Sequence, residues 1–290
     1  MRFCTFVFVC CFFWVSGCGF GSVGRLMPWG DRRPKVALVL CGGAARGFAH
    51  AGAIRALERA KIPIDLIVGT NTGSLIGAIY ADKKSGSELE TIALGLEERD
   101  IFDYNFINPT QGFARGERLE DFVAKKLGAK EIGELKLLFA AVATDIQNGE
   151  IVIFQSGSIA RAVHASSAIP GIFIPVSYQG KLLVDGGALD NAPVDVARKM
   201  GADVVIAIDL GEGAKAAPVS NIFENVVQGF YLMARQNTEA KLKQADVVIR
   251  PKVSEVGWID FSRKKEVFAL GVQAAEQALP AIRAKLGVKS

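Results

Sequence analysis

The chain has 290 residues, of which 50% are hydrophobic and 22% are charged. This composition indicates globular protein, with enough apolar residues for one large domain or two small ones. The formal net charge of +4 becomes +3 without residues 1–17, where Arg2 is the only charge, and no polybasic patch indicates a nucleic-acid partner.

The N-terminal segment is strongly apolar. Residues 1–18 read MRFCTFVFVCCFFWVSGC, with one basic residue, an apolar run from Phe3 to Trp14, and small residues after it. This is the layout of a secretory signal peptide, and the apolar run is too short to span a bilayer comfortably. The sequence therefore predicts a signal peptide over residues 1–17, with a short buried helix as the alternative.

The end of this segment, Val15-Ser16-Gly17-Cys18, resembles a bacterial lipobox. The resemblance implies cleavage before Cys18 and lipid on its sulfur and its new amino terminus, whereas a plain signal peptide is the alternative. Two or more acyl chains anchor a protein stably, at about 0.8 kcal/mol per buried methylene. We therefore expect a lipid-anchored protein of the bacterial cell envelope. Gly19 resembles the residue that follows the cysteine in outer-membrane lipoproteins, which applies if the organism has two membranes.

The five cysteines lie at positions 4, 10, 11, 18 and 41. Cleavage removes three of them and acylation uses Cys18, so Cys41 alone remains and no internal disulfide is expected. Residues 18–33, which are rich in glycine and arginine, predict a flexible tether. Residues 34–290 are then expected to form a single domain, with a motif-bearing core at about 36–198.

From Lys35 onward, short β-branched runs alternate with helical patterns, which is typical of parallel strands joined by crossover helices. The runs near residues 68 and 206 are apolar throughout, as in strands covered on both faces. The predicted strands are Val36–Leu40, Ile64–Val68, Leu137–Thr144, Ile151–Phe154, Leu182–Val184, Val204–Ile208 and Val247–Ile249. The predicted helices are Gly47–Ala60, Ser74–Tyr80, Gly116–Leu127, Val194–Met200, Ile222–Lys243 and Lys264–Leu286. We expect one layered α/β domain.

A glycine turn, CGGAARGFAHAGAIRALE, follows the first predicted strand and enters a helix. Such a turn aims backbone N–H groups outward at the positive end of a helix dipole, which suits an anion. A dinucleotide fingerprint would need glycine at Ala44 and an acidic residue closing the second strand, whereas Asp65 begins that strand. An anion- or nucleotide-binding module that uses this loop alone is a remote interpretation.

The second predicted strand leads into Gly69-Thr70-Asn71-Thr72-Gly73 and then a helix. This is the pattern of a nucleophile elbow, which exposes one residue on a tight strand-to-helix turn and needs glycine two residues before and after it. The apex residue here is Asn71, whose amide has no ionisable O–H or S–H with which to attack an ester. Asparagine tolerates positive φ, so the turn is expected to persist.

A third motif, Asp185-Gly186-Gly187, follows a short predicted strand. A carboxylate at a glycine turn can reach across a site and act as a general base for a nearby hydroxyl. An isolated Asp-Gly more commonly bonds its own backbone, so this motif alone decides little.

Together and in this order, the three motifs resemble the patatin-like phospholipase family. The stretches ARAVHASSAIPGIFIPV and ADVVIRPKVSEVGWIDFSRKKE agree with that likeness, which extends from about Val36 to the C-terminal helix. The resemblance implies a layered α/β/α patatin-like fold and a serine–aspartate dyad that cleaves lipid acyl esters without a metal or other cofactor. It also implies an oxyanion loop at Gly42, Gly43, Ala44, Arg46 and Gly47, and the dyad aspartate at Asp185.

The chain departs from the family pattern at three positions: Asn71 replaces the serine, Cys41 replaces the first loop glycine, and His164 stands where an arginine is usual. Only the first departure disables the mechanism, and loss of a serine-hydrolase nucleophile costs roughly 10⁶ in turnover. We expect the Asn71 amide to donate a hydrogen bond to Asp185.

No other residue is an evident replacement for the nucleophile. No serine has glycine both two before and two after it, and Ser74 is expected to bond backbone in the first helical turn. Thr70 and Thr72 are expected to point away from the apex. Cys41 is expected to be a small buried thiol. The two histidines, His50 and His164, lie far apart and give no metal spacing.

Two interpretations of the function follow, and the sequence leaves open whether the chain is an enzyme. In the first, a patatin-like lipoprotein with a disabled acyl-ester hydrolase site binds lipid or membrane acyl esters as an accessory protein anchored through Cys18. In the second, an active lipid acyl hydrolase uses a substitute nucleophile. The oligomeric state and the natural lipid are not determined by these patterns.

Overall fold

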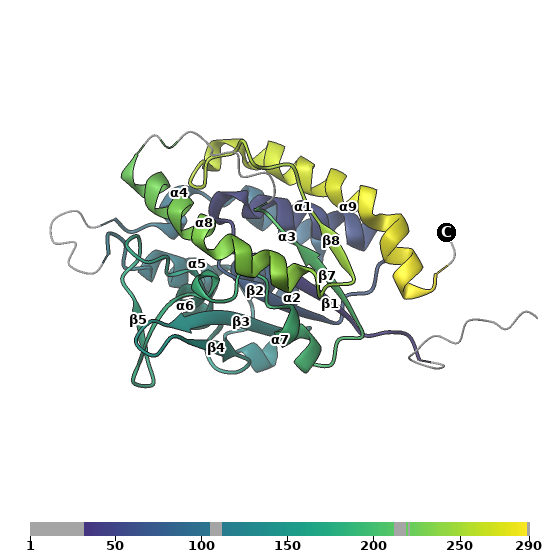
Figure 1. The fold of residues 1–290 in the computed structure, drawn as a ribbon, viewed down its shortest axis with the longest axis horizontal. Coiled ribbons are helices and arrows are strands. Elements are labelled where there is room, and N and C mark those ends of the chain that lie inside the picture. Colours follow the sequence, from purple (N-terminus) through teal and green to yellow (C-terminus); the bar gives the residue numbers. More distant parts are fainter. Residues whose placement is uncertain (1–31, 105–111, 212–218, 220, 289–290) are drawn as a thin grey trace, which may run out of the picture.

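A mixed β-sheet of eight strands organises the chain, in the order β5-β6-β3-β2-β1-β7-β8, with β4 paired to β3 (Figure 1). The structure is a computed structural model that describes residues 32–104, 112–211, 219 and 221–288. The strands are β1 Val36–Leu40, β2 Leu66–Thr70, β3 Leu138–Asp145, β4 Glu150–Phe154, β5 Val176–Tyr178, β6 Lys181–Asp185, β7 Val204–Ile208 and β8 Val247–Ile249. The helices are α1 Phe48–Arg59, α2 Thr72–Lys83, α3 Gly86–Leu94, α4 Glu98–Ile101, α5 Glu117–Lys126, α6 Ile159–Ser167, α7 Val194–Lys199, α8 Ile222–Leu242 and α9 Lys264–Leu286.

The central strands are parallel, as the alternating pattern predicted. Strands β3, β2, β1, β7 and β8 pair in parallel, whereas β4 and β6 run antiparallel to β3, and β5 runs antiparallel to β6. The expectation of a layered α/β fold with a mostly parallel sheet is confirmed. Parallel strands need crossovers, and most of the helices provide them.

Side chains of the central strands alternate between two cores, because successive residues of a strand point to opposite faces. On β1, Val36, Leu38 and Leu40 pack into the larger core, and Ala37 and Val39 pack into the smaller one. All five are fully buried, which explains why this run is apolar throughout.

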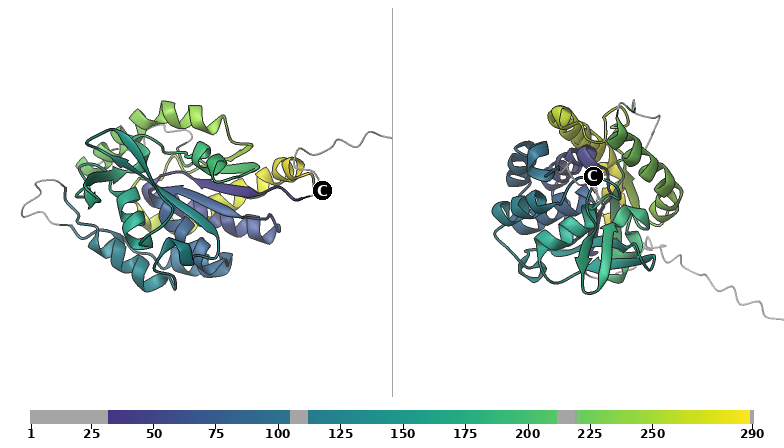
Figure 2. Two further views of the ribbon diagram at one scale, coloured as in Figure 1. Left: turned by 90° about the horizontal axis from the view of Figure 1, so that it is seen from below. Right: turned by 90° about the vertical axis from the view of Figure 1, so that its left-hand side faces the viewer.

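Helices cover both faces of the sheet. Helices α1, α2 and α9 pack over the larger core, and α7 with the end of α8 packs over the smaller one. In the left panel of Figure 2, α8 lies on one side of the sheet and the helices of the first half of the chain lie on the other. The sheet is therefore the middle layer. The loops that carry the three motifs follow the ends of strands β1, β2 and β6.

The predicted elements match the structure well, with differences at boundaries and in short elements. Strand β2 spans Leu66–Thr70 instead of Ile64–Val68, because its register with β1 pairs Leu66 with Ala37. The shift places the first elbow glycine, Gly69, inside the strand. Strand β5 and helices α3, α4 and α6 were not among the predicted elements. They are short, and β5 forms only by pairing with β6.

The start of the described chain is held against the domain. The Arg32 guanidinium bonds Asp203 at 2.5 and 2.8 Å, and that of Arg33 bonds Asp65 at 2.6 and 2.7 Å. The predicted signal peptide, Cys18 and residues 18–31 of the predicted tether lie outside the described residues. Among the residues that are described, no helix combines the length and apolar character needed to cross a bilayer.

Helices α1 and α9 run side by side (Figure 1) and approach closely at two glycines. A Cβ atom added to Gly271 would lie 2.0 Å from the Ala49 carbonyl oxygen, and one added to Gly52 would lie 2.0 Å from the Phe268 carbonyl oxygen. Both neighbours are backbone atoms, which move only if a helix moves. The pair of glycines therefore sets the distance between the two helices.

Replacing Gly271 with alanine is expected to lower the free energy of unfolding by about 1–3 kcal/mol, because the added methyl group overpacks this contact. Urea denaturation measures the change. The matched control is Gly229→Ala on α8, where an added Cβ meets no atom within 4 Å. That substitution should stabilise the helix by up to about 1 kcal/mol. Equal effects of the two substitutions would show that the close approach does not limit packing.

Candidate functional site

The three sequence motifs meet where strands β1, β2 and β6 end. The glycine loop follows β1, Asn71 follows β2, and Asp185 ends β6. Strand β3 brings the last two together, since its Val142 pairs with Thr70 of β2 and its next residue, Ala143, pairs with Asp185. Residues 71 and 185 are thus neighbours because their strands flank adjacent positions of the same strand.

The backbone of Asn71 has the conformation of an elbow apex, with φ 55° and ψ −128°. Positive φ is uncommon outside glycine, and asparagine is one of the residues that tolerate it best. Ser166 supports the turn, because its hydroxyl and carbonyl oxygens accept from Asn71 N–H at 3.0 and 3.1 Å. The Ser166 hydroxyl in turn donates to Val142 at 2.6 Å. Asparagine therefore occupies the apex without breaking the turn.

Both flanking glycines are required by contact with backbone. A Cβ at Gly69 would lie 2.4 Å from the Gly73 carbonyl oxygen, and a Cβ at Gly73 would lie 2.1 Å from the Leu40 carbonyl oxygen. These distances are far below van der Waals contact. The elbow pattern read from the sequence thus has a direct steric cause.

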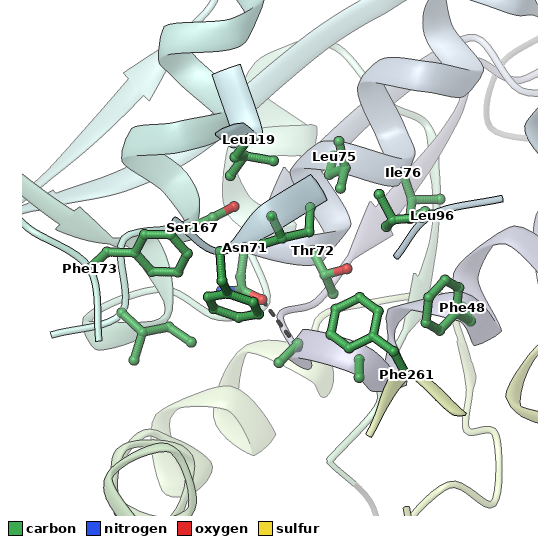
Figure 3. Close-up of a pocket in the computed structure, with 15 residues that line it drawn as sticks. Phe48, Asn71, Thr72, Leu75, Ile76, Leu96, Leu119, Ser167, Phe173 and Phe261 are labelled. Atoms are coloured by element: carbon green, nitrogen blue, oxygen red, sulfur yellow. Dashed lines mark hydrogen bonds between the residues drawn. The ribbon is translucent and has the colours of Figure 1, made fainter. Parts of the chain in front are cut away.

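The side-chain amide of Asn71 bridges the other two motifs. Its Nδ2 donates to Asp185 Oδ2, as expected from the sequence, and its Oδ1 accepts from Ala44 N–H at 3.2 Å (Figure 3, dashed line). Asn71 and Asp185 are both buried. One amide therefore satisfies both the carboxylate that would activate a nucleophile and a backbone donor of the glycine loop.

Asp185 is held in a dry environment that favours its neutral form. Burial raises the pKa of Asp185 to about 7, although hydrogen bonds from Gly187 N–H, at 2.7 Å, and from Asn71 oppose that shift. The carboxylate thus bonds its own turn and also reaches across the site. The bond within the turn is the one considered for an isolated Asp-Gly, whereas the general-base role stays a prediction.

The glycine loop offers fewer uncommitted donors than its sequence suggests. The Gly42 N–H donates to Asn191 Oδ1 at 2.9 Å, and the Ala44 N–H donates to Asn71. No described residue accepts a hydrogen bond from Gly43 N–H. Ala44 itself has φ 46°, a conformation that glycine adopts more easily. Among the described residues, Gly43 N–H is therefore the uncommitted donor of the loop, and the oxyanion role stays a prediction.

Arg46 and Gly47 support the loop from behind. Arg46 is completely buried, and its guanidinium donates to the carbonyls of Val256 at 2.9 Å and Ser254 at 3.1 Å. Burial lowers the pKa of Arg46 to about 10. A Cβ at Gly47 would lie 2.1 Å from Thr72 Oγ1, so glycine is needed where the loop meets α2. Arg46 therefore ties the loop to the C-terminal segment and does not point at Asn71.

A largely apolar pocket adjoins the apex. The cavity itself is small, about 60 Å³, which is well below the roughly 300–1,000 Å³ of most ligand sites. Figure 3 shows Leu75 and Leu119 above Asn71, Phe173 to its left and Phe261 to its right. The polar lining residues are Asn71, Thr72 and Ser167, and the apolar ones are Ala44, Ala45, Phe48, Leu75, Ile76, Leu96, Ile101, Phe102, Leu119, Ile169, Phe173 and Phe261. Such a lining suits an aliphatic chain.

The other sequence candidates lie close to the site but are committed elsewhere. Cys41 is fully buried, and burial raises the pKa of its thiol well above the usual value. His50 Nε2 bonds the Cys41 carbonyl at 2.7 Å, and His164 Nδ1 bonds Glu120 at 2.6 Å. The Ser74 hydroxyl donates to the Asn71 carbonyl at 2.6 Å, as predicted.

Thr70 and Thr72 differ from each other. Thr70 points away from the apex and donates to the Asp190 carbonyl at 3.0 Å, as predicted. Thr72 lines the pocket, as does Ser167. Three further residues at the site, Ser166, Asn191 and Tyr231, have no sequence pattern that marks them. Within the described ranges, no group of three or more histidine, cysteine or acidic side chains is placed to hold a metal ion.

Comparisons with known proteins agree with this geometry. A family model described as "Patatin-like phospholipase" matches residues 38–198. The chain is 30% identical over 274 residues to "Lysophospholipase NTE1" of Scheffersomyces stipitis, an alignment that covers 83% of this chain and 18% of that protein. It is 38% identical over 184 residues to "Patatin-like phospholipase domain-containing protein 6" of Homo sapiens, covering 61% of this chain and 13% of that protein. The chain thus spans less than a fifth of the length of these relatives.

The fold has a solved counterpart. The crystal structure of VipD from Legionella pneumophila aligns with a TM-score of 0.61 at 16% sequence identity, covering 86% of this chain and 67% of that one. At this identity the likeness concerns the fold. The family resemblance read from the three motifs is confirmed by the family model and by the curated relatives.

The raised pKa of Asp185 predicts a pH-dependent loss of stability. Between pH 3.8, the usual pKa, and about 7, the folded state holds a proton on Asp185 that the unfolded state has released. The free energy of unfolding should therefore fall as pH rises through this window.

Urea denaturation of the wild type and of Asp185→Asn across this window measures the effect. The Asp185→Asn protein cannot ionise at this position. Its unfolding free energy, relative to that of the wild type, should therefore increase as pH rises, by up to a few kcal/mol. Other titrating groups contribute equally to both proteins. Parallel curves would mean that Asp185 is ionised throughout.

Proposed function

Because this chain belongs to the patatin-like phospholipase family, a family of lipid hydrolases, we propose that its site binds lipid acyl esters without cleaving them. The observation that carries this proposal is the Asn71 amide, which occupies the nucleophile position and bonds both Asp185 and the Ala44 amide. Membership of the family does not by itself establish activity, since chemistry depends on the residues of the site.

The absence of cleavage follows from the chemistry of the amide. A carboxamide nitrogen is not nucleophilic, and its N–H protons are far too weakly acidic for Asp185 to remove. In serine hydrolases, loss of the nucleophile lowers turnover by roughly 10⁶, and the residual rate comes from the oxyanion hole and binding. Because the oxyanion hole and the pocket do not depend on the nucleophile, its loss leaves ligand binding in place.

Retention of binding is supported by the parts of the site that do not depend on a nucleophile. The pocket beside Asn71 is lined by aliphatic and aromatic side chains, and Ala44 N–H lies at its inner end. An acyl chain buried there gains about 0.8 kcal/mol per methylene group. The ester carbonyl is then placed at the apex, where it competes with Asn71 Oδ1 for the loop donors.

The alternative is an active lipid acyl hydrolase with a substitute nucleophile. Thr72 and Ser167 are the pocket hydroxyls that favour it. Against it, the described residues give neither hydroxyl a hydrogen bond to Asp185, whose oxygens accept from Asn71 and Gly187. Cys41 is a thiol rather than a thiolate, because its burial opposes ionisation.

For the location, we propose a lipoprotein of the bacterial cell envelope, anchored through Cys18 and facing acyl lipids of the membrane. The support is the sequence Val15-Ser16-Gly17-Cys18 after an apolar run. In an organism with two membranes, Gly19 favours the outer one. A binding protein held at a membrane meets its lipid ligands at high local concentration.

Labelling of the mature protein with a fluorophosphonate probe tests the inactive site. The wild type is expected to remain unlabelled, whereas Asn71→Ser should react with the probe and hydrolyse short acyl esters, because it restores a hydroxyl beside Asp185 and the loop donors. Turnover of the variant should exceed that of the wild type by several orders of magnitude. Asn71→Ala is the matched control, since it removes the amide without supplying a hydroxyl. Covalent labelling of the wild type at any residue would disprove the proposal.

Lipid anchoring is tested separately through Cys18. Cys18→Ser should prevent acylation and release the protein from the membrane fraction, and globomycin should cause accumulation of the uncleaved precursor. Cys41→Ser is the control, because Cys41 is buried in the fold and carries no lipid. Recovery of a soluble wild-type protein that retains Met1 would contradict the anchor.

A further inference from the structure

Tyr231 on α8 carries a buried hydroxyl group. The residue is 7% exposed, and its hydroxyl oxygen has no hydrogen-bond partner in the described part of the chain. A buried polar group without a partner destabilises the folded protein, because it has lost its hydrogen bonds to water. A hydrogen bond between this hydroxyl and a ligand group or a water molecule therefore stabilises the folded protein.

The ring of Tyr231 is fixed. It stacks on Trp258 with centroids 4.2 Å apart and an interplanar angle of 5°. Trp258 is itself held by a 2.6 Å hydrogen bond to Gln228 and by the Arg46 guanidinium, 3.7 Å from its ring centroid. The phenol cannot turn to find a partner elsewhere without disturbing this stack.

The hydroxyl lies at the apex of the site. A Cβ atom built on Gly42 would be 2.5 Å from Asn191 Oδ1 and 3.0 Å from both the Tyr231 hydroxyl oxygen and Asn71 Cβ, so these three side chains meet at Gly42. Burial, and then the nearby Asp185, raise the pKa of Tyr231 well above its usual value, against smaller opposing effects of Arg46 and then of the Ala44 N–H. The phenol is therefore a neutral O–H group.

The donors expected at this position are largely committed to other groups. Gly42 N–H is bonded to Asn191, and Ala44 N–H is bonded to Asn71. A carbonyl oxygen that enters the site accepts up to two hydrogen bonds, and Tyr231 supplies a rigid donor that no protein group occupies. Glycine at position 42 lets the Tyr231 hydroxyl lie this close to Asn71, because a Cβ there would collide with Asn191 Oδ1.

We propose that Tyr231 donates its O–H to the ester carbonyl oxygen of the bound acyl lipid and so acts as a ligand-binding residue beside the glycine loop. The inference rests on the proposed function, because it assumes that acyl esters enter the pocket. It adds a residue that lies outside positions 38–198, the part of the chain that the family model matches.

Binding of two decanoyl ligands to the wild type tests the contact. One is decanoyl lysophosphatidylcholine, and the other is its decyl ether analogue, which lacks the carbonyl oxygen. The wild type should bind the ester about 3- to 10-fold more tightly than the ether, as expected for one hydrogen bond. In Tyr231→Phe this preference should disappear while ether binding is unchanged. Isothermal titration below the micelle concentration measures both.

Stability provides a readout that separates a ligand contact from a structural role. Tyr231→Phe removes a hydroxyl that has no protein partner, so its thermal midpoint without ligand should equal or exceed that of the wild type. The matched control is Tyr80→Phe, where a buried hydroxyl bonded to Glu58 at 3.5 Å is lost far from the apex. That variant should be destabilised and should keep the preference for the ester.

The same substitution in the Asn71→Ser background tests the role during turnover. Loss of one oxyanion donor elsewhere costs about 10² to 10³ in rate. Adding Tyr231→Phe should therefore lower kcat for a short acyl ester about 100-fold, with little change in KM.

The outcomes separate this inference from the proposed function. Equal binding of ester and ether by the wild type, or an unchanged kcat in the Asn71→Ser, Tyr231→Phe double variant, would overturn the role of Tyr231 and leave lipid binding intact. Either result would mean that the Tyr231 hydroxyl bonds a water molecule instead of the ligand. Failure of the wild type to bind either ligand, together with an inactive Asn71→Ser variant, would overturn both proposals.

Discussion

The site depends on one amide placed between a buried carboxylate and a backbone N–H. A buried carboxylate without donors is unfavourable, and Asp185 sits where no solvent reaches it. The Asn71 amide donates to that carboxylate and accepts from Ala44, so each group finds a partner of the correct polarity. Serine would offer one hydroxyl at this position, whereas asparagine offers a donor and an acceptor on separate atoms. The asparagine amide at position 71 therefore leaves both buried groups hydrogen-bonded.

The architecture around this bridge is that of a hydrolase. Positive φ at residue 71, the backbone contacts that require Gly69 and Gly73, and the support from Ser166 all hold the apex in a tight turn. Backbone in such sparsely populated regions costs of order 1–3 kcal/mol and persists where surrounding structure fixes it. The chain retains this constraint although its apex residue cannot attack an ester. Retention of the turn agrees with a role for the pocket in binding.

The C-terminal third of the domain contributes more to the site than its motifs indicate. Arg46 reaches from the glycine loop to the carbonyls of Ser254 and Val256 and lies over Trp258, and Trp258 stacks on Tyr231. This stack joins the loop after β1 to α8 and to the segment before α9.

The sequence by itself determined the layered α/β class, the parallel central strands, the three motifs and the identity of the apex residue. Those features are local: apolar runs, glycine spacing and strand ends are set by residues close together in the chain. The contact between Asn71 and Asp185 was predicted only with the aid of the family resemblance. The tertiary structure decided which loop donors are committed to Asn191 and Asn71, that Arg46 points away from the site, and that Tyr231 faces the apex from 160 residues along the chain. No periodicity encodes such contacts, because they arise where β3 sets the strand ends side by side and α8 folds back across them.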